Sequence, residues 1–251
     1  MANSLKPLSK NNLNIAVIMD GNGRWALSNA LNISKGHQKG VQVVKDIVQE
    51  SVQQKISSLT LYAFSSENWS RPKAEIEAIK KLVLTAIEEQ VPELIEQKVK
   101  LTFFGRHDNF GKKISEKIKE AELNTNTSEP SLNLNVALGY GGRQDIVDLT
   151  KNISSRVLAK EINVDDINEE MVSNFSCVPQ DKIDLLIRTG GDKRVSNFLL
   201  YQIAYAEIFF IDKYWPDFEK EDFISCINKF NKVSRRSVSY THLTLPTSYA
   251  V

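Results

Sequence analysis

The chain has 251 residues, of which 41% are hydrophobic and 25% are charged, and its formal net charge is +1. This composition can fill a globular core and excludes a globally disordered chain. The near-neutral charge offers no broadly basic surface, so we expect no nucleic-acid partner. Any anion must therefore be bound by local clusters of side chains.

The cysteines and the lack of long apolar runs indicate in which cellular compartment the protein works. Cys177 and Cys226 are far apart and form no CxxC pattern, so they indicate neither a disulfide framework nor a zinc site. Residues 1–6 lack the apolar run of a signal peptide. No stretch approaches the roughly 20 apolar residues that span a bilayer. We expect a cytoplasmic protein, whose substrate can still be a lipid.

Short apolar runs alternate with amphipathic stretches along the chain. Strands are expected at 15–19, 59–64, 99–104, 132–138, 183–187 and 208–211. Helices are expected at 36–52, 72–97, 110–123, 145–158, 168–175 and 218–233. Pro72 can start the second of these helices, and Pro92 predicts a break or kink within it.

This alternation predicts an α/β fold with a mainly parallel six-stranded sheet and helices on both faces. Ligands in such sheets bind beyond the carboxyl ends of the strands. Polar, Gly-rich or Arg-bearing segments follow the first, second, fourth and fifth strands, so we expect them to meet at one rim. There is no repeat or linker. We expect one domain at 14–236, after an N-terminal extension at 1–13.

The segment Asp20-Gly21-Asn22-Gly23-Arg24 follows the first strand and precedes a helix. A Gly-x-Gly turn exposes backbone N–H groups that suit an anionic oxygen. Asp20 is a hard ligand of the kind that Mg²⁺ takes together with substrate phosphate. The Arg24 guanidinium matches phosphate geometry. Taken alone, the segment is equally compatible with an ordinary Asp-Gly turn.

The segment after the second strand mixes hydroxyl, carboxylate, amide, aromatic and guanidinium groups. Its members are Ser65, Ser66, Glu67, Asn68, Trp69 and Arg71. A large aromatic amid so many polar residues favours a binding site over a polar loop with one core tryptophan.

The segment after the fifth strand holds Arg188 and Arg194 on either side of a glycine pair, followed by Val195 and Ser196. We expect Ser196 to cap a helix. Two arginines and a helix N-terminus would clamp a diphosphate, with charge-assisted bonds of about 1.5–3 kcal/mol each. A basic surface loop is the alternative.

Two further residues are candidates on weaker grounds. His37 follows a glycine at the start of the first long helix, where a histidine can donate to phosphate but is more often a local cap. Glu207 is a carboxylate inside an apolar run, and a buried carboxylate needs an arginine or a metal as partner.

Several of these segments together resemble the cis-prenyltransferases, and most closely the bacterial undecaprenyl diphosphate synthases. The matching segments run in the family's order at 18–26, 36–37, 60–72, 140–143, 184–191, 194–207 and 215–218. The family joins an allylic diphosphate, often farnesyl diphosphate, to successive isopentenyl diphosphate units with cis double bonds. The product is a precursor of the lipid carrier for cell-wall synthesis.

The resemblance implies a role for each matched residue. Asp20 would be the Mg²⁺-linked catalytic aspartate and Asn68 would take part in proton removal, with Ser65, Ser66 and Glu67 beside it. The allylic diphosphate cradle would comprise Gly21, Asn22, Gly23, Arg24 and His37. Trp25 and Trp69 would line the prenyl site, and Arg71 would be a further substrate contact. The isopentenyl diphosphate site would comprise Arg188, Arg194, Val195 and Ser196. Glu207 would be a second Mg²⁺ ligand.

The resemblance also implies a homodimer and a long apolar tunnel within the α/β fold. The apolar faces of the helices at 41–52 and 76–97 could line that tunnel or could be plain core. A lipid product would bring the enzyme to a membrane surface transiently.

The chain departs from the family pattern in three places. Asn14 stands where a histidine is usual, and Ile33 replaces an arginine that contacts diphosphate. Because isoleucine cannot donate a hydrogen bond, allylic substrate binding should weaken, and Lys35 would compensate only in part. Residues 237–251 are atypical, and we expect a loosely packed, non-native tail.

The alternatives to a catalytic cis-prenyltransferase are a binding protein and a different transferase. A non-catalytic subunit that supports a partner synthase would lose the Asp-Gly-Asn-Gly-Arg and Arg-x-x-Gly clusters, and both are present. A nucleotide-dependent phosphotransferase would need a GxxxxGK[ST] loop, which is absent.

Overall fold

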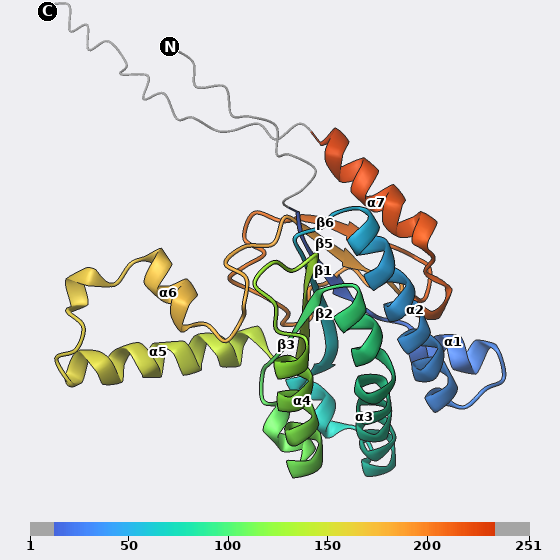
Figure 1. The fold of residues 1–251 in the computed structure, drawn as a ribbon, viewed down its shortest axis with the longest axis horizontal. Helices are drawn as coiled ribbons and strands as arrows, with labels where there is room; N and C mark the ends of the chain where they lie inside the picture. The colour runs from blue at the N-terminus through green and yellow to red at the C-terminus, as the bar shows by residue number, and fades with distance from the viewer. Residues whose placement is uncertain (1–12, 234–251) are drawn as a thin grey trace, which may run out of the picture.

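The structure is a computed structural model that describes residues 13–233. Its centre is a six-stranded sheet in the order β3-β4-β2-β1-β5-β6 (Figure 1), and every neighbouring pair is parallel. The strands are β1 (Asn14–Ile18), β2 (Ser58–Ser65), β3 (Val99–Phe104), β4 (Leu132–Tyr140), β5 (Leu185–Arg188) and β6 (Glu207–Phe210). The predicted six-stranded α/β sheet is confirmed, with all its strands parallel.

The α-helices of the described chain connect these strands. They are α1 (Asn22–Ser28), α2 (Ile33–Gln53), α3 (Lys73–Glu96), α4 (Lys112–Asn124), α5 (Gly142–Leu158), α6 (Glu169–Phe175) and α7 (Lys220–Lys232). α3 runs through Pro92 as one helix, so of the predicted break or kink, the break is wrong. Pro92 is exposed, near the end of a helix whose inner side is held by Ile87 and Leu94.

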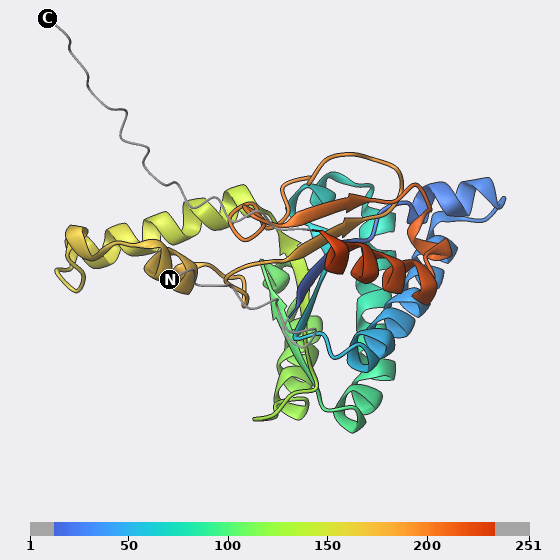
Figure 2. The ribbon, with the colours of Figure 1, turned by 90° about the horizontal axis from the view of Figure 1, so that it is seen from above.

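One face of the sheet carries the main hydrophobic core. Alternate residues of the strands, such as Ile15 and Val17 in β1, point to this side because side chains of a strand alternate between faces. Helices α2, α3, α4 and α7 cover it and contribute buried side chains such as Ile47 and Ile118. Figure 2 shows α2, α3 and α7 together on one side of the strands.

The other face is covered differently from the prediction of helices on both sides. Its cluster includes Ile18, Tyr62, Leu186, Phe198 and Leu199, and no helix of residues 13–233 adds a buried side chain to it. The irregular segment before β6 covers this face instead. Helices α5 and α6 extend away from the sheet as an arm (Figures 1 and 2).

Leu13 is buried in the main core, one residue before the expected start of the domain. The atypical tail at 237–251 lies outside the described residues. No helix within residues 13–233 has the length and apolar character needed to span a membrane.

Ile47 tests the core on the helical face because its side chain is fully buried there. We predict that Ile47→Ala lowers the free energy of unfolding by about 2–5 kcal/mol, through lost burial and the cavity left behind. Leu158→Ala, at a side chain that is 85% exposed, should change it by less than about 0.5 kcal/mol. Urea unfolding measures both values, and similar losses in the two variants would contradict the assignment.

Candidate active site

The carboxyl ends of β1, β2 and β5 lie next to one another and bring three polar segments together. Ile18 pairs with Tyr62 on one side and with Arg188 on the other. Near its end, β2 has register shifts between Tyr62 and Phe64 and between Phe64 and Ser65, an irregularity of the kind found next to active sites. The predicted convergence of these segments is therefore present.

Asp20 is held between two arginines. Its Oδ2 accepts a hydrogen bond from Arg188 Nη2 at 2.8 Å, and its Oδ1 lies 3.1 Å from Arg24 Nη2. The Asp20 backbone N–H donates to Thr189 Oγ1 at 3.1 Å, which joins the ends of β1 and β5. Gly190 (φ +88°) allows this approach, because a Cβ there would lie 2.8 Å from the Arg24 guanidinium.

A second carboxylate, Asp192, gathers the arginines of this cluster. Asp192 Oδ2 lies 2.8 Å from Arg194 Nη2, 3.4 Å from Arg188 Nη2 and 3.5 Å from Arg24 Nη2. Three guanidinium groups thus converge on one carboxylate oxygen. Because carboxylate and phosphate oxygens are bound by the same fork of donors, this arrangement suits a diphosphate.

The ion pairs determine the charge state of Asp20. Burial would raise the pKa of Asp20, but hydrogen bonds from Arg188 and the charges of Arg24 and Arg188 outweigh it. The pKa of Asp20 therefore lies below its usual value, and the side chain is a carboxylate at neutral pH. Three guanidinium groups facing two carboxylates leave an excess positive charge for a bound anion.

Arg188 is the most buried member of the cluster, with a side chain only 3% exposed. Its Nη1 donates to Ser196 Oγ at 2.7 Å and to the Arg194 carbonyl. Its Nε is buried without a hydrogen-bond partner among the described residues. Since a buried unpaired donor is costly, it indicates a missing acceptor, and a phosphate oxygen would supply one.

Ser196 does not cap a helix as predicted, because the chain between β5 and β6 is irregular there. Ser196, Asn197 and Leu199 instead have positive φ values of 47°, 61° and 46°. Buried Phe198 anchors this loop by stacking on Tyr62, with ring centroids 4.2 Å apart. Strained backbone of this kind is characteristic of functional sites, and here it places the Ser196 hydroxyl on Arg188.

The segment after β2 forms a short 3₁₀ helix, Ser66–Ser70, closed by a reciprocal capping box between Ser65 and Asn68. The Ser65 backbone N–H donates to Asn68 Oδ1 at 3.0 Å. Glu67 accepts from Asn197 Nδ2 at 2.7 Å and from Ser66 Oγ at 3.0 Å. Burial would raise the pKa of Glu67, but these bonds dominate and its pKa is lowered. Glu67 therefore ties this segment to the loop that carries Ser196.

A third group lies where α2 faces the start of α3. Arg71 Nη1 is 2.8 Å from Glu75 Oε1, and His37 Nε2 is 4.0 Å from the same oxygen. Asn32, and not His37, caps α2, so the local-cap reading of His37 is wrong. Burial and the Arg71 charge lower the pKa of His37, although Glu75 opposes them. A neutral His37 can donate one hydrogen bond to an anion.

These groups share one cavity of about 880 Å³. Its polar end includes Asp20, Arg24, Arg71, Arg188 and Ser196. Its remaining wall is apolar and comes from α2, α3 and the strands: Val41, Val44, Leu61, Phe64, Ile79, Leu82, Val83, Ala86, Ile87, Val91, Leu94, Leu101, Phe103, Leu134, Val136 and Leu138. The inner faces of α2 and α3 are thus partly cavity wall and partly core. The cavity is at the upper end of the usual size for a ligand pocket.

Five predicted site residues do not line this cavity: Trp25, Ser66, Trp69, Val195 and Glu207. Trp25 Nε1 donates to Asp217 Oδ1 at 2.7 Å, which fixes α1 to the Trp215–Asp217 turn. Trp69 packs edge-on against Phe64 and Phe110 in the core. Ser66 Oγ donates to Glu67, which lines the cavity. Val195 packs against the hydrophobic cluster on the other face of the sheet. The prediction that the two tryptophans line the prenyl site finds no support in this chain.

Glu207 is separated from Asp20 within the chain. Glu207 is the first residue of β6 and pairs with Leu185 of β5. Three residues further along β5, Arg188 pairs with Phe210 on one side and with Ile18 of β1 on the other. Three residues of strand correspond to about 10 Å. Glu207 therefore lies toward the amino end of the parallel sheet and is only partly buried. The predicted sharing of one Mg²⁺ with Asp20 is not reproduced by the geometry of the single chain.

Of the three carboxylates that line the cavity, Glu67 contacts Asn197 and Glu75 contacts Arg71, whereas Asp20 lies in the arginine cluster and is the candidate ligand for Mg²⁺. Among residues 13–233, no group of three or more His, Cys, Asp or Glu side chains could hold a metal ion by itself. Mg²⁺ commonly binds through one or two carboxylates together with waters and substrate phosphates. Asn22 Oδ1 is buried at the same cavity without a hydrogen-bond partner, so it can accept from a metal-bound water. The residues fit an ion shared with a bound diphosphate.

Sequence reasoning missed several residues that complete the site. Asp192 and Asn197 belong to the segment after β5, but no sequence pattern indicates which residues they contact. Glu75 follows Arg71 at the i,i+4 spacing of a helical ion pair, a signal that could have found it. Tyr214 gave no signal, because it contacts the site only through the tertiary fold.

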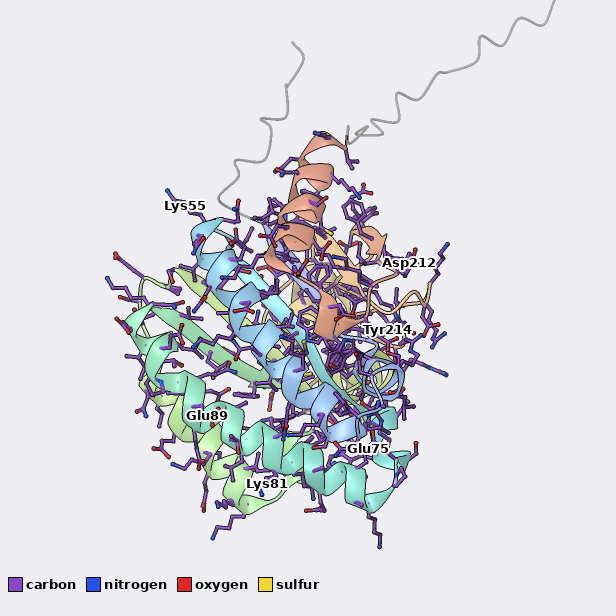
Figure 3. The ribbon with its side chains drawn as sticks, turned by 90° about the vertical axis from the view of Figure 1, so that its right-hand side faces the viewer. Lys55, Glu75, Lys81, Glu89, Asp212 and Tyr214 are labelled. Carbon is purple, nitrogen blue, oxygen red and sulfur yellow. The ribbon has the colours of Figure 1, made fainter. Side chains whose placement is uncertain are left out.

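Tyr214 packs on the turn after β1. The Arg24 guanidinium lies over its ring, 5.4 Å from the centroid. A Cβ at Gly21 would lie 2.7 Å from the ring, so the glycine makes room for it. Figure 3 shows Tyr214 near α1 and Glu75 at the start of α3, whereas Lys81 and Glu89 lie farther along that helix. Tyr214 therefore holds Arg24 in place from outside the cavity.

Comparison with known proteins identifies the family. A family described as "Putative undecaprenyl diphosphate synthase" matches residues 18–238. A ditrans,polycis-undecaprenyl-diphosphate synthase ((2E,6E)-farnesyl-diphosphate specific) of Escherichia coli (strain K12) is 41% identical over 223 residues, 88% of each chain. The chain belongs to the undecaprenyl diphosphate synthase family of cis-prenyltransferases. A synthase with the same description from Photorhabdus laumondii is also 41% identical, over 88% of this chain and 87% of its own.

Solved structures show the same fold in members of this family. Lavandulyl diphosphate synthase from Lavandula x intermedia, crystallised with dimethylallyl diphosphate, superposes with a TM-score of 0.86 at 29% identity, covering 90% of this chain and 97% of its own. A probable undecaprenyl diphosphate synthase from Campylobacter jejuni gives 0.73 at 32% identity, covering 91% and 98%. The resemblance and the fold class inferred from the sequence are confirmed.

The contact between Tyr214 and Arg24 can be tested with inorganic pyrophosphate and Mg²⁺. We predict that Tyr214→Leu weakens pyrophosphate binding about 2- to 30-fold, because a cation–π contact contributes about 0.5–2 kcal/mol. Tyr214→Phe keeps the ring and should bind like the unchanged protein. Isothermal titration calorimetry measures both, and a Phe variant as weak as the Leu variant would contradict the ring contact.

Proposed function

We propose that this protein is a Mg²⁺-dependent synthase that condenses an allylic diphosphate with successive isopentenyl diphosphate units in cis. One observation carries the proposal. The arginine cluster around Asp20 opens directly into an apolar cavity of about 880 Å³, so a single site offers an anion-binding end and room for a hydrocarbon chain. A phosphotransferase acting on nucleotides would have no use for so long an apolar wall.

The substrates follow from family membership and from the names of the relatives. Relatives at 41% identity are farnesyl-diphosphate-specific undecaprenyl diphosphate synthases. We therefore assign farnesyl diphosphate as the starter and undecaprenyl diphosphate as the product. The product would be the precursor of the lipid carrier for cell-wall synthesis.

The allylic diphosphate would lie with its diphosphate against Arg24, Asn22, the backbone of Gly21 and Gly23, and His37. The bond between the allylic carbon and the diphosphate oxygen breaks, and its electron pair leaves with the diphosphate. Arg24 and Arg188 stabilise this growing charge more in the transition state than before it. Mg²⁺, held by Asp20, would supply further charge neutralisation when bound. The cavity wall shields the allylic cation from water.

Isopentenyl diphosphate would be held by Arg194, Arg188 and Ser196. Its terminal alkene carbon then forms the new bond to the allylic cation. A proton passes from the methylene group on the diphosphate side of the alkene to an oxygen of the released diphosphate, and its C–H electron pair forms the next double bond. Asn68 lies on the cavity wall beside Ser65 and Glu67, where this proton would be removed. Arg71, held by Glu75, would contact the substrate at the mouth of the cavity.

We further propose that the protein works as a homodimer in the cytoplasm, without a nucleic-acid partner. Its lipid product would bring it to a membrane surface transiently. A second Mg²⁺ contact from Glu207, implied by the resemblance, is not available within the chain described above and is left out of the proposed site.

The alternative of a non-catalytic subunit is disfavoured by the site itself. Such a subunit would not need the ion pairs of Asp20 with Arg24 and Arg188, nor the Arg188–Ser196 contact. All are present, with a buried donor on Arg188 still unpaired.

The deciding experiment incubates the purified protein with farnesyl diphosphate, labelled isopentenyl diphosphate and Mg²⁺. We expect labelled product that extracts into butanol and disappears when the metal is chelated. A protein that binds both diphosphates but forms no extractable product would support the non-catalytic subunit instead.

Asp20→Ala tests the assigned catalytic carboxylate. We predict loss of turnover by at least about 100-fold, because the metal-linked charge stabilisation of the leaving group is lost. The fold should remain, since Arg188 keeps Asp192, Ser196 and the Arg194 carbonyl as partners. Circular dichroism checks the fold, and a folded variant with near-normal turnover would remove Asp20 from this role.

Ile33 allows a gain-of-function test, since it lines the cavity at a position where the family resemblance implies an arginine. We predict that Ile33→Arg lowers KM for the allylic diphosphate about tenfold, the effect of one charge-assisted hydrogen bond. KM for isopentenyl diphosphate should not change. Ile33→Lys is the matched control and should gain less, because an ammonium lacks the guanidinium fork. Equal gains from both would indicate a non-specific charge effect.

A further inference from the structure

The turn between α1 and α2 has an unusual surface. Every residue from Leu27 to Ser34 is exposed, and none is charged. A quarter of the whole chain is charged, and the other long uncharged runs of residues 13–233 contain buried or half-buried residues, unlike this one. Exposed turns normally carry charges, so this composition needs an explanation.

Three aliphatic side chains stand out on this turn. Leu27 is 68% exposed, Leu31 41% and Ile33 37%. Single exposed leucines are ordinary, but three within seven residues form a patch, and such patches mark interaction sites. We call residues 27–33 the apolar tip. In Figures 1 and 2, α1 and this turn project at the edge of the molecule.

Basic residues flank the apolar tip. Lys35 and Lys39 follow it on α2 and are exposed, whereas Arg24, which precedes it, is paired with Asp20 and Asp192. The carboxylates that contact α1 are engaged within the protein, since Asp20 and Asp192 pair with arginines and Asp217 accepts from Trp25. An aliphatic tip with a basic border is the pattern of segments that bind the interface of an anionic bilayer.

The apolar tip is continuous with the cavity. Ile33 is both exposed and part of the cavity lining, beside Gly23 of the diphosphate cradle. A hydrocarbon chain leaving the cavity past Ile33 would therefore meet the tip before it met open water.

We infer that the apolar tip docks the protein on a lipid bilayer that carries anionic headgroups, with Leu27, Leu31 and Ile33 entering the acyl boundary. The inference rests on the proposed function, because it gives the lipid product a route from the cavity into the membrane. A second copy of the chain is a poorer occupant. A stable protein interface buries about 800 Å² on each partner, far more than a seven-residue tip offers.

Vesicle sedimentation with the full chain tests this docking without any turnover. Large unilamellar vesicles of phosphatidylcholine and phosphatidylglycerol serve as the probe. We expect the double variant Leu27→Ser/Leu31→Ser to bind at least about tenfold less than the unchanged protein, since each buried methylene contributes about 0.8 kcal/mol. Binding should also fall with added salt and on pure phosphatidylcholine.

The matched control is Leu123→Ser/Leu158→Ser, which removes two leucines that are 76% and 85% exposed on other helices. It should bind vesicles like the unchanged protein. Absence of binding by the unchanged protein, equal binding by the tip variant, or an equal loss in the control would overturn the inference. A change of oligomeric state in the tip variant by sedimentation velocity would overturn it in favour of a second copy.

Turnover in detergent solution separates this inference from the proposed function. The tip variant should keep normal turnover there, since neither leucine lines the cavity. A protein that docks through the tip but forms no polyprenyl product would refute the proposed function and leave the docking surface standing.

Discussion

The buried guanidinium of Arg188 is the constraint on which the rest of the site depends. A cation that is only 3% exposed must be balanced, because removing a charge from water is expensive. The chain balances it with Asp20 from the end of β1, Asp192 after β5, and the Ser196 hydroxyl and Arg194 carbonyl from the loop beyond. One side chain therefore joins the segment after β1 to the segment after β5. The remaining unpaired donor and the excess positive charge make the same cluster receptive to diphosphate.

The second constraint is that the helices on one face of the sheet both close the hydrophobic core and line the cavity. Ile47 and Ile118 close the core against the sheet, while Val83 and Val91 face a cavity. The cavity can stay open because both sides of its entrance are fixed by polar contacts. Trp215 Nε1 donates to the Gly40 carbonyl on α2, and the Arg71–Glu75 ion pair fixes the start of α3. Apolar walls and a charged entrance together suit a substrate with a lipid tail.

The sequence predicted the sheet, most helix positions and the convergence of the polar segments, because strand and helix periodicity and the Gly-rich turns are local signals. It could not divide core from cavity, since Val83 and Ile47 look alike in an amphipathic pattern. It also misjudged Ser196 and Trp69. The position of Ser196 depends on Phe198 stacking on Tyr62, and that of Trp69 on Phe110, contacts between residues far apart in the chain. The placement of Glu207 at the far end of the sheet follows from strand register, which the sequence does not encode locally.

A crystal structure with a non-hydrolysable farnesyl diphosphate analogue and Mg²⁺ would test the central claim most directly. The account predicts the diphosphate between Asp20, Arg24 and Arg188, with an oxygen accepting from Arg188 Nε, and the hydrocarbon along Val44, Val83 and Leu138. A diphosphate bound away from Arg24 and Arg188, or a hydrocarbon outside the cavity, would contradict it.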